Sequence, residues 1–255
     1  MKEFELLGEL ERRGLIVGVE HDAAQIEGLV VTQDALVEGV HFRFDLIGWR
    51  ELGFRAAAVN LSDLAASGAE PIALIVSLAA PSLDGAIELY EGIAEAGVPV
   101  RGGDTTRADS VVLSVTAIGR AERVPGRADA RPGDLLVVTG PLGGAGAAFR
   151  AGRLVRPPVR IDEGRRLAAV AHAMLDISDG LGLDAGHIAE RSGCRLEIDV
   201  DAVPLADGAT VEDLAFGEDY ELLAATPDPL DFAVIGRCVE GSGVSVDLGG
   251  WEHFG

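Results

Sequence analysis

The stretch Gly102-Gly103-Asp104-Thr105-Thr106 carries an arginine on each flank and lies between two apolar runs, residues 98–100 and 110–115. This position predicts a loop between two strands. Two glycines let the backbone approach a ligand closely, and the aspartate after them can bind a hard cation. The flanking arginines can neutralise phosphate oxygens. Taken alone, however, the stretch is better interpreted as an ordinary hairpin turn with glycine and aspartate in turn positions.

The composition limits the class of protein. The 255 residues suffice for one large domain or two of ordinary size, and a hydrophobic content of 48% allows a substantial core. The formal net charge of −21 disfavours nucleic acid and anionic membranes as partners. Lys2 is the only lysine, so arginine must supply nearly all fixed positive charge. An anionic substrate would therefore need metal ions between it and this chain.

Other sequence features point to a cytoplasmic protein without a zinc site. Cys194 and Cys238 are far apart in the sequence, which disfavours both a disulfide framework and a cysteine-bound zinc. No apolar run approaches the length of about 18 residues that a membrane-spanning helix needs. The acidic N-terminus, residues 1–5, lacks the core of a signal peptide.

Periodic patterns predict alternating helices and strands in both halves of the chain. In the first half we expect helices over residues 3–13, 49–68 and 84–96, and strands over 15–19, 29–32, 72–78 and 110–120. In the second half we expect helices over residues 162–174 and 181–191, and strands over 135–139, 196–200, 232–239 and 243–248. Residues 129–134 have a linker composition, which predicts domains 1–130 and 131–255.

The predicted helix 49–68 carries a polar line through an otherwise small and apolar sequence. Asn60, Asp63 and Ser67 are spaced i, i+3 and i+7, which places them on one helical face. The many alanines indicate close packing on all sides. We therefore interpret Asp63 as aimed at a site rather than at solvent.

Acidic residues recur where apolar elements end. They are Asp22, Asp34, Asp63, Asp104, Asp176 and Asp179. No histidine and cysteine cluster accompanies them, and carboxylates alone suit Mg²⁺ or Mn²⁺. Several magnesium ions typically hold a polyphosphate, and phosphoryl transfer needs mainly positioning and charge neutralisation. Spacing alone leaves open whether these aspartates meet or are scattered over an acidic surface. The glycine-rich turn 140–146 is only a weak candidate for a phosphate seat, since it lacks the P-loop lysine.

Six stretches together resemble the thiamine-monophosphate kinase family of the aminoimidazole-ribonucleotide-synthetase-like superfamily. They are Asp22–Ala24, Asp34–Phe42, Ala58–Ala66, Gly102–Thr106, Asp176–Leu181 and Gly217–Leu222. The resemblance implies a mixed α/β (α+β) fold of two domains, with the N-terminal sheet forming a barrel across a homodimer and a C-terminal α/β sandwich. It implies ATP-dependent phosphorylation of thiamine monophosphate to thiamine diphosphate, by direct in-line transfer with several Mg²⁺ ions, in the cleft between the domains.

The resemblance also implies roles for individual residues. As metal ligands it implies Asp22, Thr32, Asp34, Asp63, Asp104, Asp176 and Asp179. As ATP contacts it implies Gly103, Asp104, Arg127, Ser178 and Tyr90. As substrate contacts it implies His41, Glu218 and Trp251. It implies no catalytic side chain beyond these, because the transfer is assisted by metal.

Three positions depart from the family pattern. His21 stands where the family has a first aspartate before Asp22, and Gln33 stands where it has a threonine, so that one ligand would come from an amide or a backbone carbonyl. Leu248 replaces an aromatic residue, so that any stacking on the substrate would fall to Trp251. The alternatives are another ATP-dependent synthetase of the superfamily or a non-catalytic, acidic cation-binding homologue.

Overall fold

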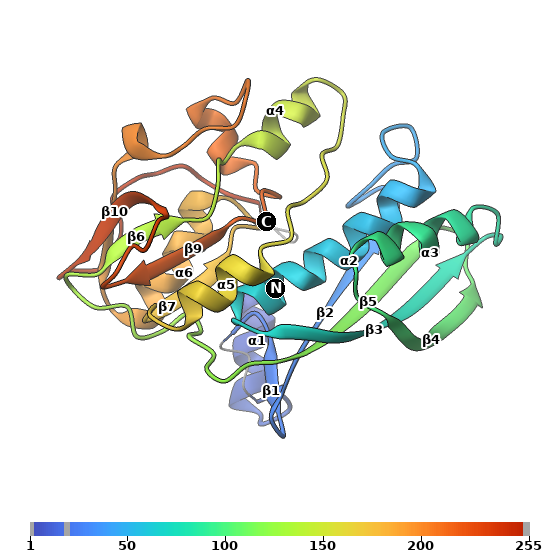
Figure 1. Cartoon of the computed structure of the whole chain (residues 1–255), viewed down its shortest axis with the longest axis horizontal. Coiled ribbons are helices and arrows are strands. Elements are labelled where there is room, and N and C mark those ends of the chain that lie inside the picture. Colours follow the sequence, from blue (N-terminus) through green and yellow to red (C-terminus); the bar gives the residue numbers. More distant parts are fainter. Residues whose placement is uncertain (1–2, 18–20, 252–255) are drawn as a thin grey trace.

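The computed structural model describes residues 3–17 and 21–251, and its first half is built on one five-stranded sheet (Figure 1). The strand order is β1-β2-β5-β3-β4, and only the β3–β4 pair is parallel. The elements are α1 (Glu3–Arg12), β1 (Ala24–Ile26), β2 (Leu29–Val37), α2 (Trp49–Ala66), β3 (Glu70–Ala80), α3 (Ala86–Glu95), β4 (Val100–Arg107) and β5 (Val112–Arg120).

The second half forms a six-stranded sheet in the order β11-β8-β10-β6-β9-β7. Its elements are β6 (Leu135–Val138), α4 (Gly144–Arg150), α5 (Ile161–Ala168), β7 (Ala173–Asp176), α6 (Leu181–Ser192), β8 (Arg195–Ile198), the 3-10 helices η1 (Val200–Ala202) and η2 (Val211–Ala215), β9 (Leu222–Thr226), β10 (Ala233–Val239) and β11 (Gly243–Val244). The mixed α/β fold expected from the sequence is thus present in both halves. The chain passes from the first sheet to the second between β5 and β6, where the linker is predicted.

The helix α2 lies at the centre of the molecule and packs on both halves (Figure 1). One side of α2 covers β2 and β5, while α3 and α5 lie against its other sides. A Cβ atom on Gly53 would collide with the carbonyl oxygen of Leu89, so glycine permits the close crossing of α2 and α3. At its C-terminal end, Ala65 and Ala66 join a small buried cluster with Leu167 and other residues of the second half. The small side chains of α2 therefore serve close packing, as the sequence predicts.

The opening stretch is a strand and not the predicted loop. Residues Val100–Arg107 form β4, which pairs in parallel with β3 at the edge of the first sheet. Gly103 has φ 153° and lies so close to the backbone of Val76 that no side chain would fit between them. The two glycines thus permit close strand pairing, and the chain reverses only after Arg107.

Several other predicted boundaries are wrong. Residues 15–17 form no strand, and the rest of that predicted strand lies outside the described residues. The helix predicted over 162–174 ends at Ala168, because the backbone from His172 onward hydrogen-bonds to β9 instead. In the strand predicted over 243–248, only Gly243–Val244 pairs with a neighbour. Local pattern could not reveal these outcomes, since they depend on pairing with distant strands.

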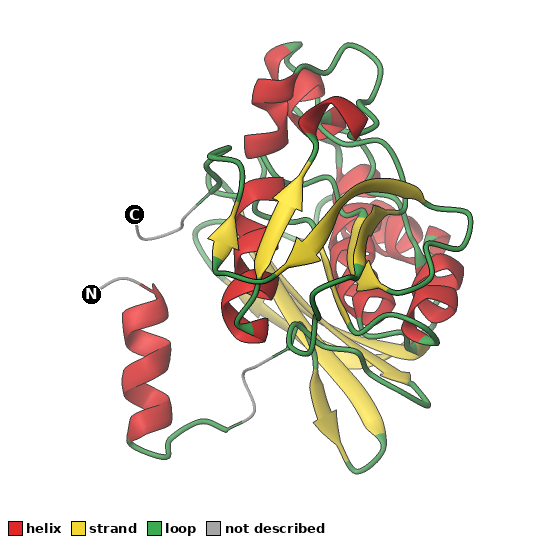
Figure 2. Ribbon diagram, turned by 90° about the vertical axis from the view of Figure 1, so that its left-hand side faces the viewer, coloured by secondary structure: helices red, strands yellow, loops and turns green. Residues whose placement is uncertain are grey.

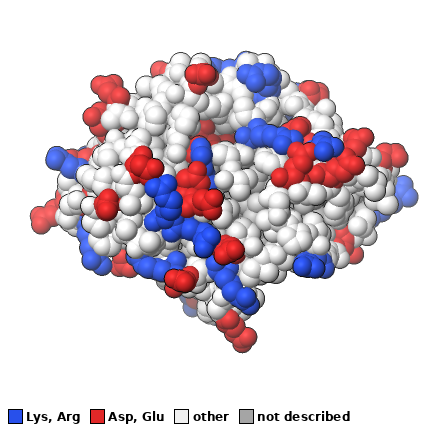
Figure 3. All heavy atoms as spheres, viewed as in Figure 1, with Lys and Arg blue, Asp and Glu red and all other residues white. Residues whose placement is uncertain are grey.

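The structure shows how the charged side chains are distributed and whether any helix is suited to cross a membrane. Basic and acidic side chains are interspersed over the face seen in Figure 3, with wide uncharged areas between them. No helix within the described residues is long and apolar enough to span a membrane.

Candidate active site

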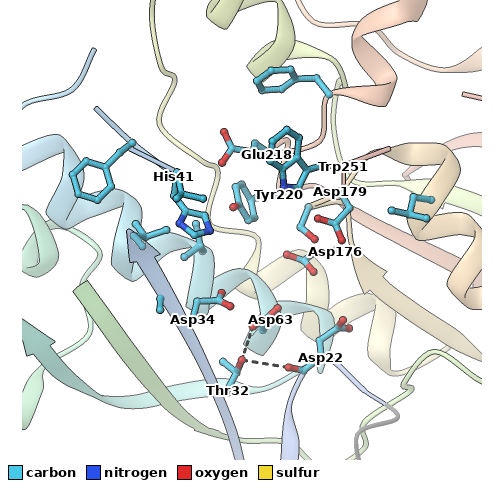
Figure 4. A pocket seen from close by; sticks show the side chains of 18 of the residues that line it. Asp22, Thr32, Asp34, His41, Asp63, Asp176, Asp179, Glu218, Tyr220 and Trp251 are labelled. Atoms are coloured by element: carbon cyan, nitrogen blue, oxygen red, sulfur yellow. Dashed lines mark hydrogen bonds between the residues drawn. The ribbon is translucent and has the colours of Figure 1, made fainter. Parts of the chain in front are cut away.

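A cavity of about 750 Å³ lies between the two halves of the chain (Figure 4). The first half contributes side chains from β2, α2 and the turn after β2. The second half contributes the turn after β7 and the loop 217–221, and Trp251 completes the wall. Of the sequence-predicted site residues, those that line it are Asp22, Thr32, Asp34, His41, Asp63, Arg127, Asp176, Ser178, Asp179, Glu218 and Trp251.

Three carboxylates meet at the floor of the cavity. Asp22, Asp63 and Asp176 each offer an oxygen, and these oxygens lie within 4.8 Å of one another. Thr32 Oγ1 hydrogen-bonds to Asp63 and lies 3.3 Å from the carbonyl oxygen of Asp22 (Figure 4). Ser62 Oγ donates to Asp176 at 2.5 Å. Side chains from separate elements thus converge on one point, which settles a question that their spacing in the sequence had left open.

The environment of these carboxylates disfavours their charged form. Burial, with repulsion from Asp22, raises the pKa of Asp176 to about 7. Burial, with repulsion from Asp176 and Asp34, raises the pKa of Asp63 well above its usual range. Arg127 contacts the group, with Nε 2.9 Å from Asp22 Oδ1. Oxygen donors with this excess of negative charge are the ligands that hard divalent cations prefer.

The turn from β7 into α6 is held by a residue that sequence reasoning missed. Asp184 Oδ2 accepts hydrogen bonds from the backbone N–H groups of Asp179 and Gly180, at 3.0 Å each. Burial raises the pKa of Asp184 well above its usual range. Its position in the first turn of the helix was the available signal, because acidic side chains stabilise helix N-termini. Asp184 thereby fixes the direction in which Asp179 enters the cavity.

The substrate-contact residues implied by the resemblance lie around the upper part of the cavity (Figure 4). His41 Nδ1 accepts a hydrogen bond of 3.0 Å from the N–H of Val37. The Trp251 backbone donates to the carbonyl oxygen of Asp179 at 2.9 Å, and its side chain reaches the cavity. Leu248 packs against α6 instead. Of the two residues weighed for stacking, Trp251 is therefore the one placed to do it.

Aromatic side chains missing from the predicted set also line the cavity. Tyr220 stands between His41 and the second-half carboxylates (Figure 4). Phe149 of α4 and Phe216 lie with ring centroids 5.2 Å apart. Tyr220 lies within the motif Gly217–Leu222, which was the available signal for it. Nothing in the sequence distinguishes phenylalanines that line the cavity from those in the core.

The two departures near the carboxylates have different settings. The ring of His21 lies against Gly126, where any side chain would collide with it, and His21 Nδ1 is buried with no hydrogen-bond partner among the described residues. The Gln33 amide is held by Ser114 and Thr116 of β5, at 3.1 Å each. Because that amide is already paired on β5, the backbone of Gln33 is the better candidate for a ligand atom.

Three predicted residues lie outside the cavity. Gly103 and Asp104 are exposed on β4, and Tyr90 lies on α3; none of the three lines it. The glycine-rich turn 140–146, a weak candidate for phosphate binding, already binds a carboxylate of the chain itself. Asp219 accepts hydrogen bonds from the N–H groups of Gly143 and Ala145, at 2.7 and 3.4 Å, so its carboxylate fills the start of α4.

Comparison with known families defines the class of this protein. The family model of the AIR synthase related protein, N-terminal domain, matches residues 20–121, and that of the C-terminal domain matches residues 131–249. The chain thus belongs to the AIR synthase related proteins, with one family domain in each of its two halves.

Individual relatives narrow the class further. The thiamine-monophosphate kinase of Aquifex aeolicus is 34% identical over 270 residues, covering 89% of this chain and 88% of its own. That of Escherichia coli K12 is 33% identical, with 93% and 92% covered. The solved structure of AaThiL complexed with AMPPCP and TMP is 34% identical with a TM-score of 0.92, covering 99% of this chain and 97% of that one. The chain belongs to the thiamine-monophosphate kinase family, which confirms the resemblance read from its motifs.

Proposed function

We propose that this protein transfers the terminal phosphoryl group of ATP to thiamine monophosphate, giving thiamine diphosphate. One observation carries the proposal beyond family membership. Motifs that are far apart in the sequence deliver five aspartates to a single cavity, namely Asp22, Asp34, Asp63, Asp176 and Asp179. A chance distribution of surface acids would not produce this convergence, nor would it raise the pKa of buried Asp63 and Asp176. The cytoplasmic location expected from the sequence stays a prediction.

The residues present fit magnesium. All donors at the floor of the cavity are oxygens, and three carboxylates share a small volume with one arginine in contact. We assign the ligand set to Asp22, Thr32, Asp34, Asp63, Asp176 and Asp179. When bound, Mg²⁺ would neutralise the phosphate oxygens and the charge that develops during transfer. Arg127 and Ser178, at the edge of this group, are placed to contact ATP phosphates directly.

The upper part of the cavity suits the thiamine end of the substrate. The thiazolium ring of thiamine carries a positive charge, and cations bind carboxylates and aromatic faces. Glu218 and Trp251 offer these two kinds of group, and both line the upper part of the cavity (Figure 4). His41 faces the same space and can donate or accept a hydrogen bond. The acceptor phosphate then points toward the aspartates, as in-line transfer requires.

A second copy of the chain would complete the site. The strand β4 is an open edge whose eight residues are almost all exposed, and such an edge invites pairing with another chain. Gly103 and Asp104 lie on β4 and Tyr90 lies on α3, and none of the three lines the cavity of its own chain. We propose that they contact ATP in the cavity of the partner within a homodimer.

The activity is tested by incubating the protein with ATP, Mg²⁺ and thiamine monophosphate and measuring thiamine diphosphate. Product is expected; its absence, in protein that binds ATP normally, would sink the proposal. Asp104→Asn should abolish turnover without disturbing the fold, since the side chain is exposed. Wild-type activity in this variant would refute the role of Asp104.

The dimer is tested by mixing two inactive variants, Asp104→Asn and Asp176→Asn, after subunit exchange. If Asp104 acts across the interface, one site of each mixed dimer is intact, and activity returns to about a quarter of the wild-type value in a two-fold dimer. If Asp104 acts within its own chain, the mixed dimer has no intact site and the mixture stays inactive.

A further inference from the structure

Arg55 is a fully buried arginine on α2 whose guanidinium faces the second half of the chain. Its side chain is 2% exposed and forms an ion pair with Glu218 through Nη2. Nη1 lies 3.4 Å from the carbonyl oxygen of Val155, and the guanidinium carbon lies 5.9 Å from the centroid of the Tyr220 ring. Nε has no hydrogen-bond partner among the described residues, and Nη2 meets Glu218 as an ion pair without the geometry of a hydrogen bond. Glu218 and Tyr220 line the cavity, whereas Arg55 does not.

The loop that carries Glu218 is held on the side away from the cavity by Asp219 and Glu221, which alternate with Glu218 and Tyr220 along the chain. Asp219 is bound by the backbone at the start of α4. Glu221 accepts hydrogen bonds from Arg160, at 2.6 and 2.7 Å, and from Thr139 at 2.6 Å. These contacts all lie within the second half of the chain and anchor the loop 217–221 to it.

The two residues that face the cavity adopt a backbone conformation that side chains disfavour. Glu218 has φ 58° and Tyr220 has φ 52°, both in the left-handed region. Their N–H groups donate to the carbonyl oxygens of Ser178 and Ile177, at 2.7 and 2.8 Å. Such strain persists only where the surroundings hold it, and it marks functional positions. The side chains of Glu218 and Tyr220 line the cavity, and both also contact Arg55, which does not line it.

We propose that Arg55 is a positioning residue for substrate binding, an inference that rests on the proposed function. Through the ion pair with Glu218 and its contact with Tyr220, Arg55 holds both side chains toward the thiamine end of the cavity. The guanidinium is buried with Glu218 as its carboxylate partner, so the Glu218 side chain cannot leave without exposing an uncompensated buried charge. The loop is therefore locked before the substrate arrives.

This lock also joins the two halves of the chain. Arg55 and Asp63 lie on the same helix, while Glu218 belongs to the second half. The ion pair therefore sets the position of the thiamine-binding loop relative to the carboxylates that face the phosphates. Loss of Arg55 should weaken the binding of thiamine monophosphate more than the binding of ATP, because the proposed ATP contacts, Arg127 and Ser178, do not touch the Arg55 side chain.

The inference is tested with Arg55→Met, which keeps the length of the side chain and removes its charge. We expect the KM for thiamine monophosphate to rise about tenfold or more, the range for losing a hydrogen bond to a charged group. The KM for ATP and the thermal midpoint in saturating ATP should change little. Arg55→Lys retains a charge within reach of Glu218 and should recover most of the affinity.

A matched control separates positioning from general support of the fold. Arg156→Met removes another arginine at the junction with α2, one that pairs with Glu51 and Glu95 and lies 4.4 Å from the Phe54 ring centroid. Arg156 does not touch the loop 217–221, so this variant should keep the wild-type KM for thiamine monophosphate.

A double-mutant cycle with Glu218→Gln decides whether Arg55 acts through Glu218. If it does, Arg55→Met adds little to the KM once Glu218 is changed. Independent, additive effects would overturn the inference, as would an unchanged KM in Arg55→Met or an equal rise in Arg156→Met. If Arg55→Met does not fold, the same cycle is run with Arg55→Gln, which also removes the charge but keeps a polar group in the buried position. Wild-type protein that makes no thiamine diphosphate would instead refute the proposed function, and with it this inference.

Discussion

Replacing Asp176 by asparagine should stabilise the metal-free protein while it abolishes activity. In the folded chain, burial and nearby carboxylates raise the pKa of Asp176 from 3.8 to about 7. The folded state therefore binds a proton more tightly than the unfolded state does. Stability from this group is full at low pH and is lost as pH rises between about 4 and 7.

The size of this effect follows from the pKa. Each pKa unit corresponds to about 1.36 kcal/mol, so at pH 8 the ionised Asp176 costs the folded state up to about 4 kcal/mol. An asparagine has no charge to bury, and its amide oxygen can still accept the hydrogen bond from Ser62. For a chain of this length the thermal midpoint rises by about 2–4 °C per kcal/mol. Metal-free Asp176→Asn should therefore unfold at least about 5 °C above the wild type at pH 8.

The assay is thermal unfolding in EDTA at pH 5 and pH 8, repeated at pH 8 with MgCl₂. The gain from Asp176→Asn should shrink at pH 5, where the wild-type carboxyl is protonated, and should also shrink when magnesium neutralises the wild-type cluster. Asp207→Asn, on an exposed aspartate, changes the net charge equally and should not shift the midpoint. If Asp176→Asn is no more stable than the wild type in EDTA at pH 8, burial and repulsion of the Asp176 charge do not destabilise the folded chain.

Two further substitutions test the two ends of the cavity. Thr32→Val removes the hydroxyl that hydrogen-bonds to Asp63, and the magnesium concentration for half-maximal activity should rise about tenfold. Thr116→Val, which removes the hydroxyl bound to Gln33, is the control and should leave that concentration unchanged. An equal rise in the two variants would contradict the role of Thr32 as a metal ligand. Trp251→Ala should raise the KM for thiamine monophosphate about tenfold with little change in the KM for ATP, because an aromatic face is lost. Leu248→Ala, at a residue that packs against α6, is the control and should leave the KM unchanged. An unchanged KM in Trp251→Ala would remove that residue from the site.

The sequence predicted site residues best where they lie on, or next to, a helix or strand with a clear hydrophobic pattern. Asp176 and Asp179 lie directly before a helix that Gly193 ends, so the turn into that helix could be predicted, although residues of the strand before it were predicted as the end of the helix over 162–174. Asp63 was found by its spacing on an alanine-rich helix. In each case local geometry alone aims the side chain at the site.

Sequence reasoning was weaker wherever distant pairing decides the outcome. The glycines at 102–103 suit a turn equally well, and only their pairing with β3 makes them part of a strand. The burial of Arg55 depends on a loop that follows it by more than 150 residues, so its position in the helix carries no signal of a role at the site. No pattern within α2 indicates that Glu218 will arrive there.

The position of Arg55 gives the helix α2 a second role beside packing. Arg55, Val59 and Asp63 follow one another at intervals of four residues, so they form one stripe along the helix. Val59 and Asp63 line the cavity, and Arg55 holds the loop at its other end. Eight residues of helix rise about 12 Å. A single helix thus separates the loop proposed to bind thiamine from the carboxylates proposed to bind magnesium by a fixed length, which would let the acceptor phosphate reach the aspartates without either half of the chain having to adjust.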